Sequence, residues 1–486
     1  MRRSLTRQTA LGFWLAWCGG LQTAWGAEAP WPRFRGPGGG GIAAADAAPP
    51  TEVGPETNLK WKVEAPGGWS SPIVVGDLLV LTAYDGDALW TIAYRRADGS
   101  EAWRKEAPYD KLEPFLANEG SPAASTPATD GERIVSYFGS CGLFCYDLAG
   151  NELWRFSMPP ARTPADFGTG VSPIIAAGLA VLVRDELNAP QIIALDVRTG
   201  RPKWDKARTS VSGYGTPAAW TTPAGTQIAA PGYGRMVGYD AATGAEAWFI
   251  EGMPASSCTS PVVSDGVLYF AGWSPGAADD AEGFKMPTYD QLLRQYDRND
   301  DGVFAKAEAE GGMFAALFDS NDTNKDGKIA RDEWEHTLAF MSNSVCSAFA
   351  VAPGGEGDAS QTHVLWREQS GGLPYVPSPL VYRGQLIMVK DGGIVTACDA
   401  ATGKRIYQKR AVASGGYYAS PVAAGDHVYF TSLADGAITV LKAGAPTPQV
   451  VTKNKPLGER TAATPAIVGE TLFVRTAGHL WAFAEP

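Results

Sequence analysis

Two twelve-residue segments in the middle of the chain have the residue types and spacing of a calcium-binding loop. They are DRNDDGVFAKAE (297–308) and DTNKDGKIARDE (322–333), and both fit the EF-hand pattern D-x-N-x-D-G-x5-E. In such a loop, oxygens at positions 1, 3, 5, 7 and 12 surround a hard cation, with the backbone carbonyl acting at position 7 and a bidentate Glu at 12. The predicted calcium ligands are Asp297, Asn299, Asp301, Val303, Glu308, Asp322, Asn324, Asp326, Lys328 and Glu333.

The other loop positions support the same chemistry. Gly302 and Gly327 provide the sharp turn at position 6, and the apolar Phe304 and Ile329 at position 8 can pair the two loops in a short sheet. Position 9 is alanine in both loops, so water alone would fill that ligand position. We therefore expect two calcium ions of modest affinity, with a structural rather than a switching role.

Short helices must position these loops. TYDQLLRQY (288–296) leads into the first loop, with Thr288 as its N-cap, and EWEHTLAFM (333–341) leaves the second. We expect the pair to form a small α-helical insertion over residues 274–343.

A repeat of fixed period surrounds this insertion. Small-residue–Pro pairs recur at intervals of 55, 46, 44, 44, 118, 42 and 44 residues, and only the 118-residue interval, in the fifth repeat, is anomalous. The chain therefore contains eight repeats and one insertion. The pairs are Ser71-Pro72, Thr126-Pro127, Ser172-Pro173, Thr216-Pro217, Ser260-Pro261, Ser378-Pro379, Ser420-Pro421 and Thr464-Pro465.

Each repeat predicts four strands. SSPIVVGDLLVLTAY (70–84) is typical of two strands joined by a tight turn, and IIALDVRTGRPKW (192–204) of a third and a fourth strand. Four strands in about 45 residues form one propeller blade, so the predicted fold is all-β, an eight-bladed β-propeller with the EF-hand pair in blade five. Aromatic residues near the start of the fourth strand are predicted to pack between blades: Trp103, Trp154, Trp204, Trp248, Trp366 and Tyr407.

The two ends of the chain are predicted to share one blade. The eighth repeat stops after its third strand, and NLKWKV (58–63) has the pattern of a fourth strand, with Trp61 in the aromatic position. Closure of this kind leaves no open sheet edge. The resulting boundaries are a signal peptide (1–26), a lead-in segment (27–57), the first part of the propeller (58–273), the insertion (274–343) and the second part (344–486).

The D-x-x-T-G-x-x-x-W turn and the eight-fold count resemble the PQQ-like propeller repeat. This repeat is shared by quinoprotein dehydrogenases and by non-catalytic propellers such as the outer-membrane assembly factor BamB. The opening WPRFRGPGGGGI (31–42) is similar to the lead-in of secreted members. The resemblance implies the fold over residues 31–486 apart from the insertion, and it leaves the activity open.

The N-terminus predicts export. Arg2, Arg3 and Arg7 precede a short apolar stretch, and small residues up to Gly26 form a cleavage site. No segment of the mature chain is long enough to cross a membrane, so we expect a periplasmic, extracellular or cell-surface protein. The net charge of −11 argues against a nucleic-acid partner.

The loops that lead into the first strands predict a binding site. Trp69, Tyr214 and Tyr418 lie three residues before the repeated Pro, and Tyr375 lies one residue earlier in its own repeat. Aromatic side chains at equivalent positions would form a partial ring around the channel and could bind a protein or a glycan. Packing between loops is the other interpretation of these residues. No catalytic residues are predicted.

The alternative function is a PQQ-dependent dehydrogenase of alcohols or sugars. Those enzymes have a vicinal disulfide that stacks on the quinone, whereas this chain has no Cys-Cys dipeptide. The preferred hypothesis is therefore a calcium-binding propeller that acts as a non-catalytic binding or scaffold protein.

Overall fold

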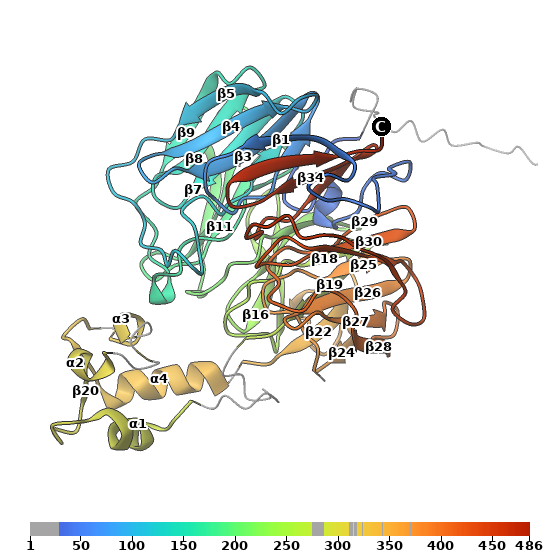
Figure 1. The fold of residues 1–486 in the computed structure, drawn as a ribbon. Helices are drawn as coiled ribbons and strands as arrows, with labels where there is room; N and C mark the ends of the chain where they lie inside the picture. The colour runs from blue at the N-terminus through green and yellow to red at the C-terminus, as the bar shows by residue number, and fades with distance from the viewer. Residues whose placement is uncertain are drawn as a thin grey trace, which may run out of the picture.

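The computed structural model describes residues 29–274, 286–310, 314, 318–322, 324–342, 344–369 and 371–486. Figure 1 shows a β-propeller with a small helical insertion at one side. The signal-peptide prediction (1–26) falls outside the described residues. None of the described helices is long and apolar enough to cross a membrane.

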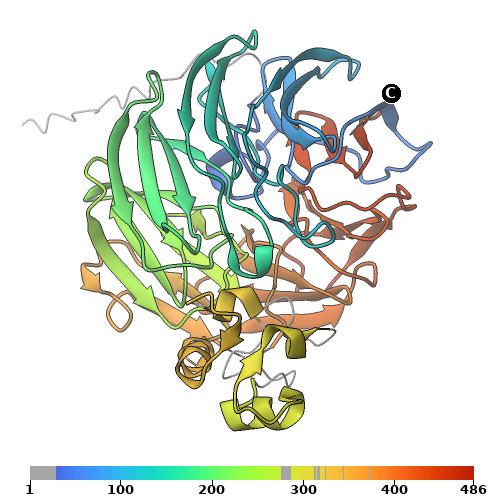
Figure 2. The same ribbon diagram turned by 90° about the vertical axis from the view of Figure 1, so that its left-hand side faces the viewer.

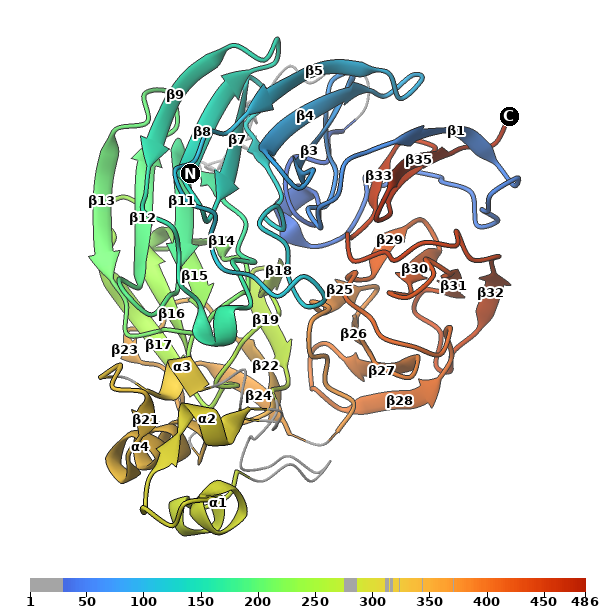
Figure 3. The same ribbon diagram turned by 60° about the vertical axis from the view of Figure 1, so that its left-hand side comes forward.

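Eight sheets stand around a common axis, so the all-β, eight-bladed propeller predicted from the repeats is confirmed (Figure 3). In every blade the strands run antiparallel, with the first strand innermost. The blades are, in order, β2–β5 (Ile73–Val75, Leu78–Tyr84, Leu89–Arg95, Glu101–Glu106), β6–β9 (Ala128–Thr129, Arg133–Phe138, Gly142–Asp147, Glu152–Ser157), β10–β13 (Ile174–Ala176, Leu179–Arg184, Gln191–Asp196, Pro202–Ala207), β14–β17 (Ala218–Thr222, Gly225–Pro231, Arg235–Asp240, Glu246–Glu251), β18, β19, β22 and β24 (Val262–Ser264, Val267–Gly272, Ser347–Val351, Val364–Glu368), β25–β28 (Leu380–Tyr382, Gln385–Lys390, Ile394–Asp399, Arg405–Arg410), β29–β32 (Val422–Ala424, His427–Thr431, Ile438–Lys442, Val450–Lys453) and β33–β35 (Ala466–Val468, Thr471–Arg475, His479–Phe483) completed by β1 (Leu59–Glu64).

The last blade closes the ring with strands from both ends of the chain. β1 pairs antiparallel with β35, and Lys62 lies opposite Trp481. The sequence predicted this strand at 58–63. Because β1 supplies the outer strand, the antiparallel pairing with β35, which has one register shift between Leu59 and Trp61, joins segments from the two ends of the chain.

The repeated Ser or Thr before each Pro joins neighbouring blades around the axis. Its backbone N–H donates a hydrogen bond of 2.9–3.0 Å to the hydroxyl oxygen of the equivalent residue in the next blade. All eight blades take part, and the eighth donates back to the first. The closed hydroxyl ring runs Ser71, Thr126, Ser172, Thr216, Ser260, Ser378, Ser420, Thr464 and back to Ser71.

The outer contacts between blades use the predicted aromatic residues. The indole N–H of Trp154 donates to the Val197 carbonyl of the next blade at 2.9 Å. Gly200 follows in the same turn with φ +69, and a Cβ there would lie 2.6 Å from the Trp154 ring. The glycine of D-x-x-T-G therefore has two roles: it adopts the left-handed conformation of the turn, and its lack of a Cβ lets the tryptophan ring of the preceding blade pack against it. The same indole-to-carbonyl bond is made by Trp61, Trp103, Trp204 and Trp366.

Trp248 departs from this arrangement. Its N–H bonds Gln227 Oε1 inside its own blade at 2.8 Å. The next blade lacks the T-G turn that would offer a carbonyl, because the chain there extends outward and adds β23 (Gly357–Asp358) parallel to β17. Trp220 of β14 makes the bond to blade five instead, on the Gly266 carbonyl.

The lead-in segment lies across the inner ends of the blades. Trp31 exchanges two backbone hydrogen bonds with Val74 of β2, and η1 (Pro37–Gly39) contacts β14 and β18. Arg35 is fully buried, and its guanidinium donates to the Pro379 carbonyl at 2.5 Å. Burial lowers the pKa of Arg35 to about 9. The segment therefore links blades that are far apart in the sequence.

The insertion leaves the propeller between β19 and β22 of blade five. Its elements are α1 (Tyr289–Tyr296), β20 (Phe304–Ala305), α2 (Lys306–Ala309), α3 (Phe318–Asn321), β21 (Lys328–Ile329) and α4 (Arg331–Ser342). Thr288 caps α1 by accepting the N–H of Gln291. Phe304 and Ile329 pair across β20 and β21, and both are buried, so the insertion has a small core of its own.

Arg475 connects the last blade to the first. Its side chain is buried in β34 and donates to the carbonyls of Pro66, Ser70 and Thr82 and to the hydroxyl of Ser70, at 2.6–3.0 Å. Burial lowers the pKa of this guanidinium to about 10, and the four acceptors offset part of the cost of removing the charge from water.

We predict that Arg475→Met lowers the free energy of unfolding by about 4 kcal/mol, because it leaves several buried acceptors without a donor. Urea unfolding would measure the change, with the exposed Arg95→Met as the matched control. A loss no larger than that of Arg95→Met would show that Arg475 does not hold the closure.

Candidate functional site

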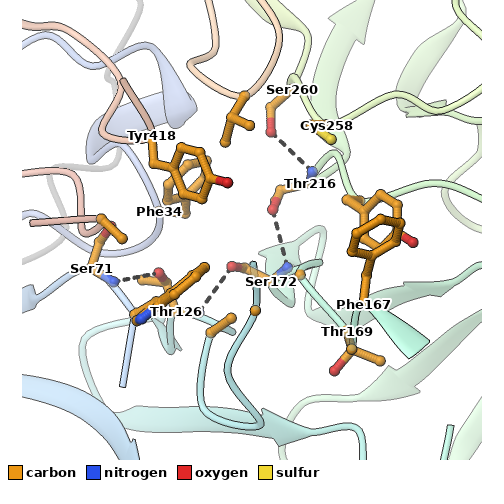
Figure 4. Close-up of a pocket in the computed structure, with 18 of the residues that line it drawn as sticks. Phe34, Ser71, Thr126, Phe167, Thr169, Ser172, Thr216, Cys258, Ser260 and Tyr418 are labelled. Carbon is orange, nitrogen blue, oxygen red and sulfur yellow. Dashed lines mark hydrogen bonds between the residues drawn. The ribbon is translucent and has the colours of Figure 1, made fainter. Parts of the chain in front are cut away.

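A funnel of about 180 Å³ opens on the channel at the face where the loops enter the first strands. Its wall contains members of the hydroxyl ring, and Figure 4 shows Ser71, Thr126, Ser172, Thr216 and Ser260 in sequence around it. Phe34 of the lead-in segment also lines the funnel. The lead-in therefore contributes an aromatic side chain to the deep end of the site.

The eight residues that stand three before each repeated Pro all line the funnel. They form a second ring beside the hydroxyl ring, because each is held in register by the same blade-to-blade bond. Large and small side chains are unevenly distributed around this ring. In blade order the residues are Trp69, Ala124, Gly170, Tyr214, Cys258, Val376, Tyr418 and Ala462.

The four aromatic residues predicted from the sequence, Trp69, Tyr214, Tyr375 and Tyr418, are brought together here, and all are half-buried. The ring centroids of Trp69 and Tyr418 lie 5.7 Å apart in an edge-to-face arrangement. Ala462, the small residue at the position between them in the ring, also lines the funnel. The structure thus places the predicted ring around one cavity, while its role in binding remains a prediction.

Charged groups lie at the rim. Tyr418 donates its phenol proton to Glu119 Oε2 at 2.6 Å. The Arg460 guanidinium lies 5.1 Å from the Trp69 ring centre and 5.7 Å from that of Tyr418, and it donates to the Asn118 carbonyl. These contacts fix the orientation of both aromatic rings at the mouth of the funnel.

The opposite wall is uncharged. Burial raises the pKa of Tyr214, and it raises the pKa of the Cys258 thiol to about 12. The pKa of Tyr375 is also raised, by Cys258 first and then by burial. Burial therefore favours the protonated form of the Cys258 thiol, which is a poor nucleophile. All five cysteines of the described chain are free.

Glu113 supports the funnel from behind. It is 1% exposed, and its carboxyl accepts hydrogen bonds from the backbone N–H and the hydroxyl of Thr169, which lines the funnel. Burial raises the pKa of Glu113 to about 8. The sequence analysis missed Glu113, Glu119, Phe167 and Phe34, because they lie in irregular segments outside the repeat pattern.

The two acidic loops of the insertion have equivalent geometry. In the first, Asp297 accepts from the N–H of Gly302, and Glu308 accepts from Arg298 and Ala305. In the second, Asp322 accepts from Gly327, and Glu333 accepts from Asn324 and Ala330. The carboxylates of both loops therefore point inward onto the backbone of their own loop.

The remaining predicted ligands lie in the same loops. Asn299 accepts from the N–H of Asp301 at 3.0 Å, and Asn324 accepts from that of Asp326 at 2.9 Å. Among the described residues, no group of three His, Cys, Asp or Glu side chains is close enough to hold an ion as it stands. Each predicted site combines three carboxylates with an amide and a backbone carbonyl.

Sequence comparison assigns the chain to a known family. The family model described as outer membrane protein assembly factor BamB, a PQQ repeat family, matches residues 55–155, 92–272, 192–302 and 354–484. The chain belongs to this family. No curated protein sequence matches the chain.

Solved structures share the fold at low identity. BamB from Moraxella catarrhalis is 13% identical, with a TM-score of 0.53 over 87% of this chain and 98% of that one. A europium-containing methanol dehydrogenase is 11% identical, with a TM-score of 0.55 over 94% and 98%. The computationally designed Ika8 protein is 12% identical, with a TM-score of 0.51 over 88% and 99%. At this identity the likeness establishes the propeller fold alone.

We predict that Glu113→Gln makes the protein more stable at pH 8 than the wild type, by on the order of a few kcal/mol, and that the difference shrinks toward pH 5. With its pKa raised to about 8, Glu113 keeps its proton in the folded state while the unfolded chain releases it above its ordinary pKa near 4.5. Wild-type stability therefore falls between these two pH values, and an uncharged amide removes the loss.

Unfolding free energies at pH 5, 6.5 and 8 would measure this effect, with the exposed Glu106→Gln as control. Parallel pH dependences for Glu113→Gln and the wild type would contradict the assignment.

Proposed function

We propose that this protein is an exported, calcium-binding propeller that acts as a non-catalytic binding protein and holds the end of an uncharged glycan in the funnel. The observation that carries the proposal is the funnel lining, which combines aromatic rings with hydroxyl groups. Among the described residues that line it there is no Lys, Arg or His, and Glu119 is the single carboxylate.

The hydroxyl ring favours a ligand with hydrogen-bond acceptors. Each ring oxygen accepts a backbone N–H, as for Ser71 and Thr126. In all eight ring bonds of the described chain the hydroxyl is the acceptor, so its own proton is not used there. A hydroxyl donates one proton, so a bound molecule has donors available along the wall. Sugar hydroxyl and ring oxygens meet this requirement.

The rim supplies the complementary groups. Glu119 is an acceptor for ligand hydroxyls, and Trp69 and Tyr418 offer apolar ring surface to the C–H faces of a sugar. A concave site with apolar walls and a few fixed polar groups is the usual form of a small-molecule site. A protein segment is the alternative ligand, and the family description of an assembly factor supports it.

The funnel does not fit PQQ. That cofactor carries three carboxylates, which need cationic or metal partners when they are removed from water. The described lining offers no cationic side chain, and Glu119 would repel the cofactor. The Arg460 guanidinium at the mouth lies against the Trp69 and Tyr418 rings and bonds the Asn118 carbonyl, so it is not directed into the funnel. The described lining contains one cysteine, Cys258, which is free and is not part of a vicinal pair.

Calcium binding is supported by the repeated loop geometry. Gly302 and Gly327 have φ +79 and +83, and the residues two before them, Asp300 and Lys325, also have positive φ. β20 and β21 hold the two loops side by side. Oxygen ligands of this kind suit Ca²⁺, and we place one ion in each loop. We also propose export to the periplasm or the cell surface, where calcium is abundant, on the basis of the signal-peptide pattern in residues 1–26.

We predict that the calcium-saturated protein binds neutral oligosaccharides on a glycan array and that Trp69→Ala weakens this binding at least tenfold, about 1.4 kcal/mol, because the stacking surface is lost. Tyr418→Ala should have a similar effect. Trp90→Ala, which removes an indole outside the funnel, is the matched control.

Binding confined to a parallel peptide array would replace the glycan with a protein partner. Tight one-to-one binding of PQQ, measured by calorimetry, would overturn the non-catalytic proposal.

We predict that Glu308→Gln with Glu333→Gln removes the rise in melting temperature that calcium gives the wild type. At free calcium 100-fold above the dissociation constant, each site stabilises the fold that binds it by roughly 2.7 kcal/mol. Scanning calorimetry with and without calcium measures the change. Glu335→Gln, on the exposed side of α4, is the control, and an unchanged calcium response in the double variant would refute both sites.

A further inference from the structure

We propose that calcium in the second loop regulates the funnel through the contact between α3 and η2 (Pro164–Asp166). This inference rests on the proposed calcium and ligand sites. It gives calcium a regulatory role at the funnel, in addition to the structural role expected from the loop sequences. The contact is direct, since α3 lies against η2, and Figure 2 shows the yellow insertion beside the teal turn of η2. The same proximity is visible in Figure 3.

On the insertion side, α3 ends at the first ligand of loop two. Asp322 follows Asn321 directly, and its N–H donates to the Phe318 carbonyl at 2.9 Å. Asn321 is also hydrogen-bonded to Thr337 of α4. We infer that an ion that draws the carboxylates of Asp322 and Glu333 together shifts α3 relative to α4, as calcium does in sensor EF-hands.

On the propeller side, η2 leads directly into the wall of the funnel. Phe167 and Thr169 follow it and line the cavity. Thr169 is the residue that the buried Glu113 holds by two hydrogen bonds. Phe167 and Thr169 lie one and three residues after the end of η2. A displacement of η2 would therefore move the funnel wall directly, because no other helix or strand lies between them.

The η2 turn has the properties of a segment that can shift. Ala165 and Asp166 both have positive φ, +53 and +52, a conformation that is unfavourable for residues other than glycine. A partly exposed ion pair, Arg162–Asp166 at 2.9 Å, spans the turn. Backbone strain of this kind persists only where the surroundings hold it, and α3 is one of those surroundings.

The coupling is reciprocal. If calcium orders the segment 164–170, it lowers the entropy cost of binding in the funnel, and an occupied funnel raises calcium affinity by the same factor. The first loop is the internal control, because α1 packs against α4 and β20 within the insertion.

The test is hydrogen–deuterium exchange on the full-length protein with calcium alone as the probe. We expect saturating calcium to slow exchange of the amides in 164–170 at least threefold in the wild type. Glu308→Gln should keep this protection, and Glu333→Gln should lose it. Each variant is measured at a calcium concentration that calorimetry has shown to saturate its remaining site.

The outcomes separate the two proposals. No calcium binding in calorimetry would overturn the calcium sites and this coupling together. Two bound ions without protection of 164–170, or protection that survives in Glu333→Gln, would overturn the coupling and leave the calcium sites in place. Protection lost only with Glu308→Gln would assign the effect to the first loop and also overturn the proposal.

Discussion

The closed ring of eight hydrogen bonds from a backbone N–H to a Ser or Thr hydroxyl is the constraint on which the rest of the molecule depends. Each residue of the ring, such as Ser172, both donates to the next blade and accepts from the previous one, so no blade can slip along the axis without breaking two bonds. The following proline fixes φ. The positions three residues earlier are therefore held in register, and the side chains there decide what the funnel can bind.

The parts of the fold that repeat were predictable from the sequence, and the parts that do not repeat were not. The strand at 58–63 was recognisable because Trp61 has the aromatic position of a fourth strand, and the structure has it at Leu59–Glu64. Trp248 packs against blade five as predicted, in one buried cluster with Leu268 and Phe349, but its indole N–H bonds within its own blade. In the other repeats with a tryptophan at this position, the indole N–H bonds a carbonyl in the turn between the third and fourth strands of the next blade. Blade five lacks the T-G turn and adds β23 there, which the repeat spacing could not predict.

The site shows the same division. Trp69, Tyr214, Tyr375 and Tyr418 were found because their distance from a repeated Pro places them at equivalent heights, and all four line the funnel. Phe34, Glu113 and Glu119 do not lie at a fixed distance from a repeated Pro, so the repeat spacing could not identify them. Phe34 enters from a lead-in whose path depends on Arg35 and the Pro379 carbonyl, and Glu113 is recognisable only by its burial. The repeat spacing therefore predicts which residues surround the funnel, whereas the residues that enter it from other segments or support its wall depend on tertiary contacts.

The point of insertion has a geometrical consequence. In a four-stranded antiparallel blade, the connection between the second and third strands emerges at the same face as the loop that enters the first strand, and the other two turns emerge at the opposite face. The insertion lies between β19 and β22, the second and third strands of blade five, so it shares a face with the funnel. An insertion at a D-x-x-T-G turn would lie on the far side of the propeller. The contact between α3 and η2 is thus available because of where the extra residues enter the repeat, and ion binding in the insertion can affect the funnel wall at a distance of a few residues.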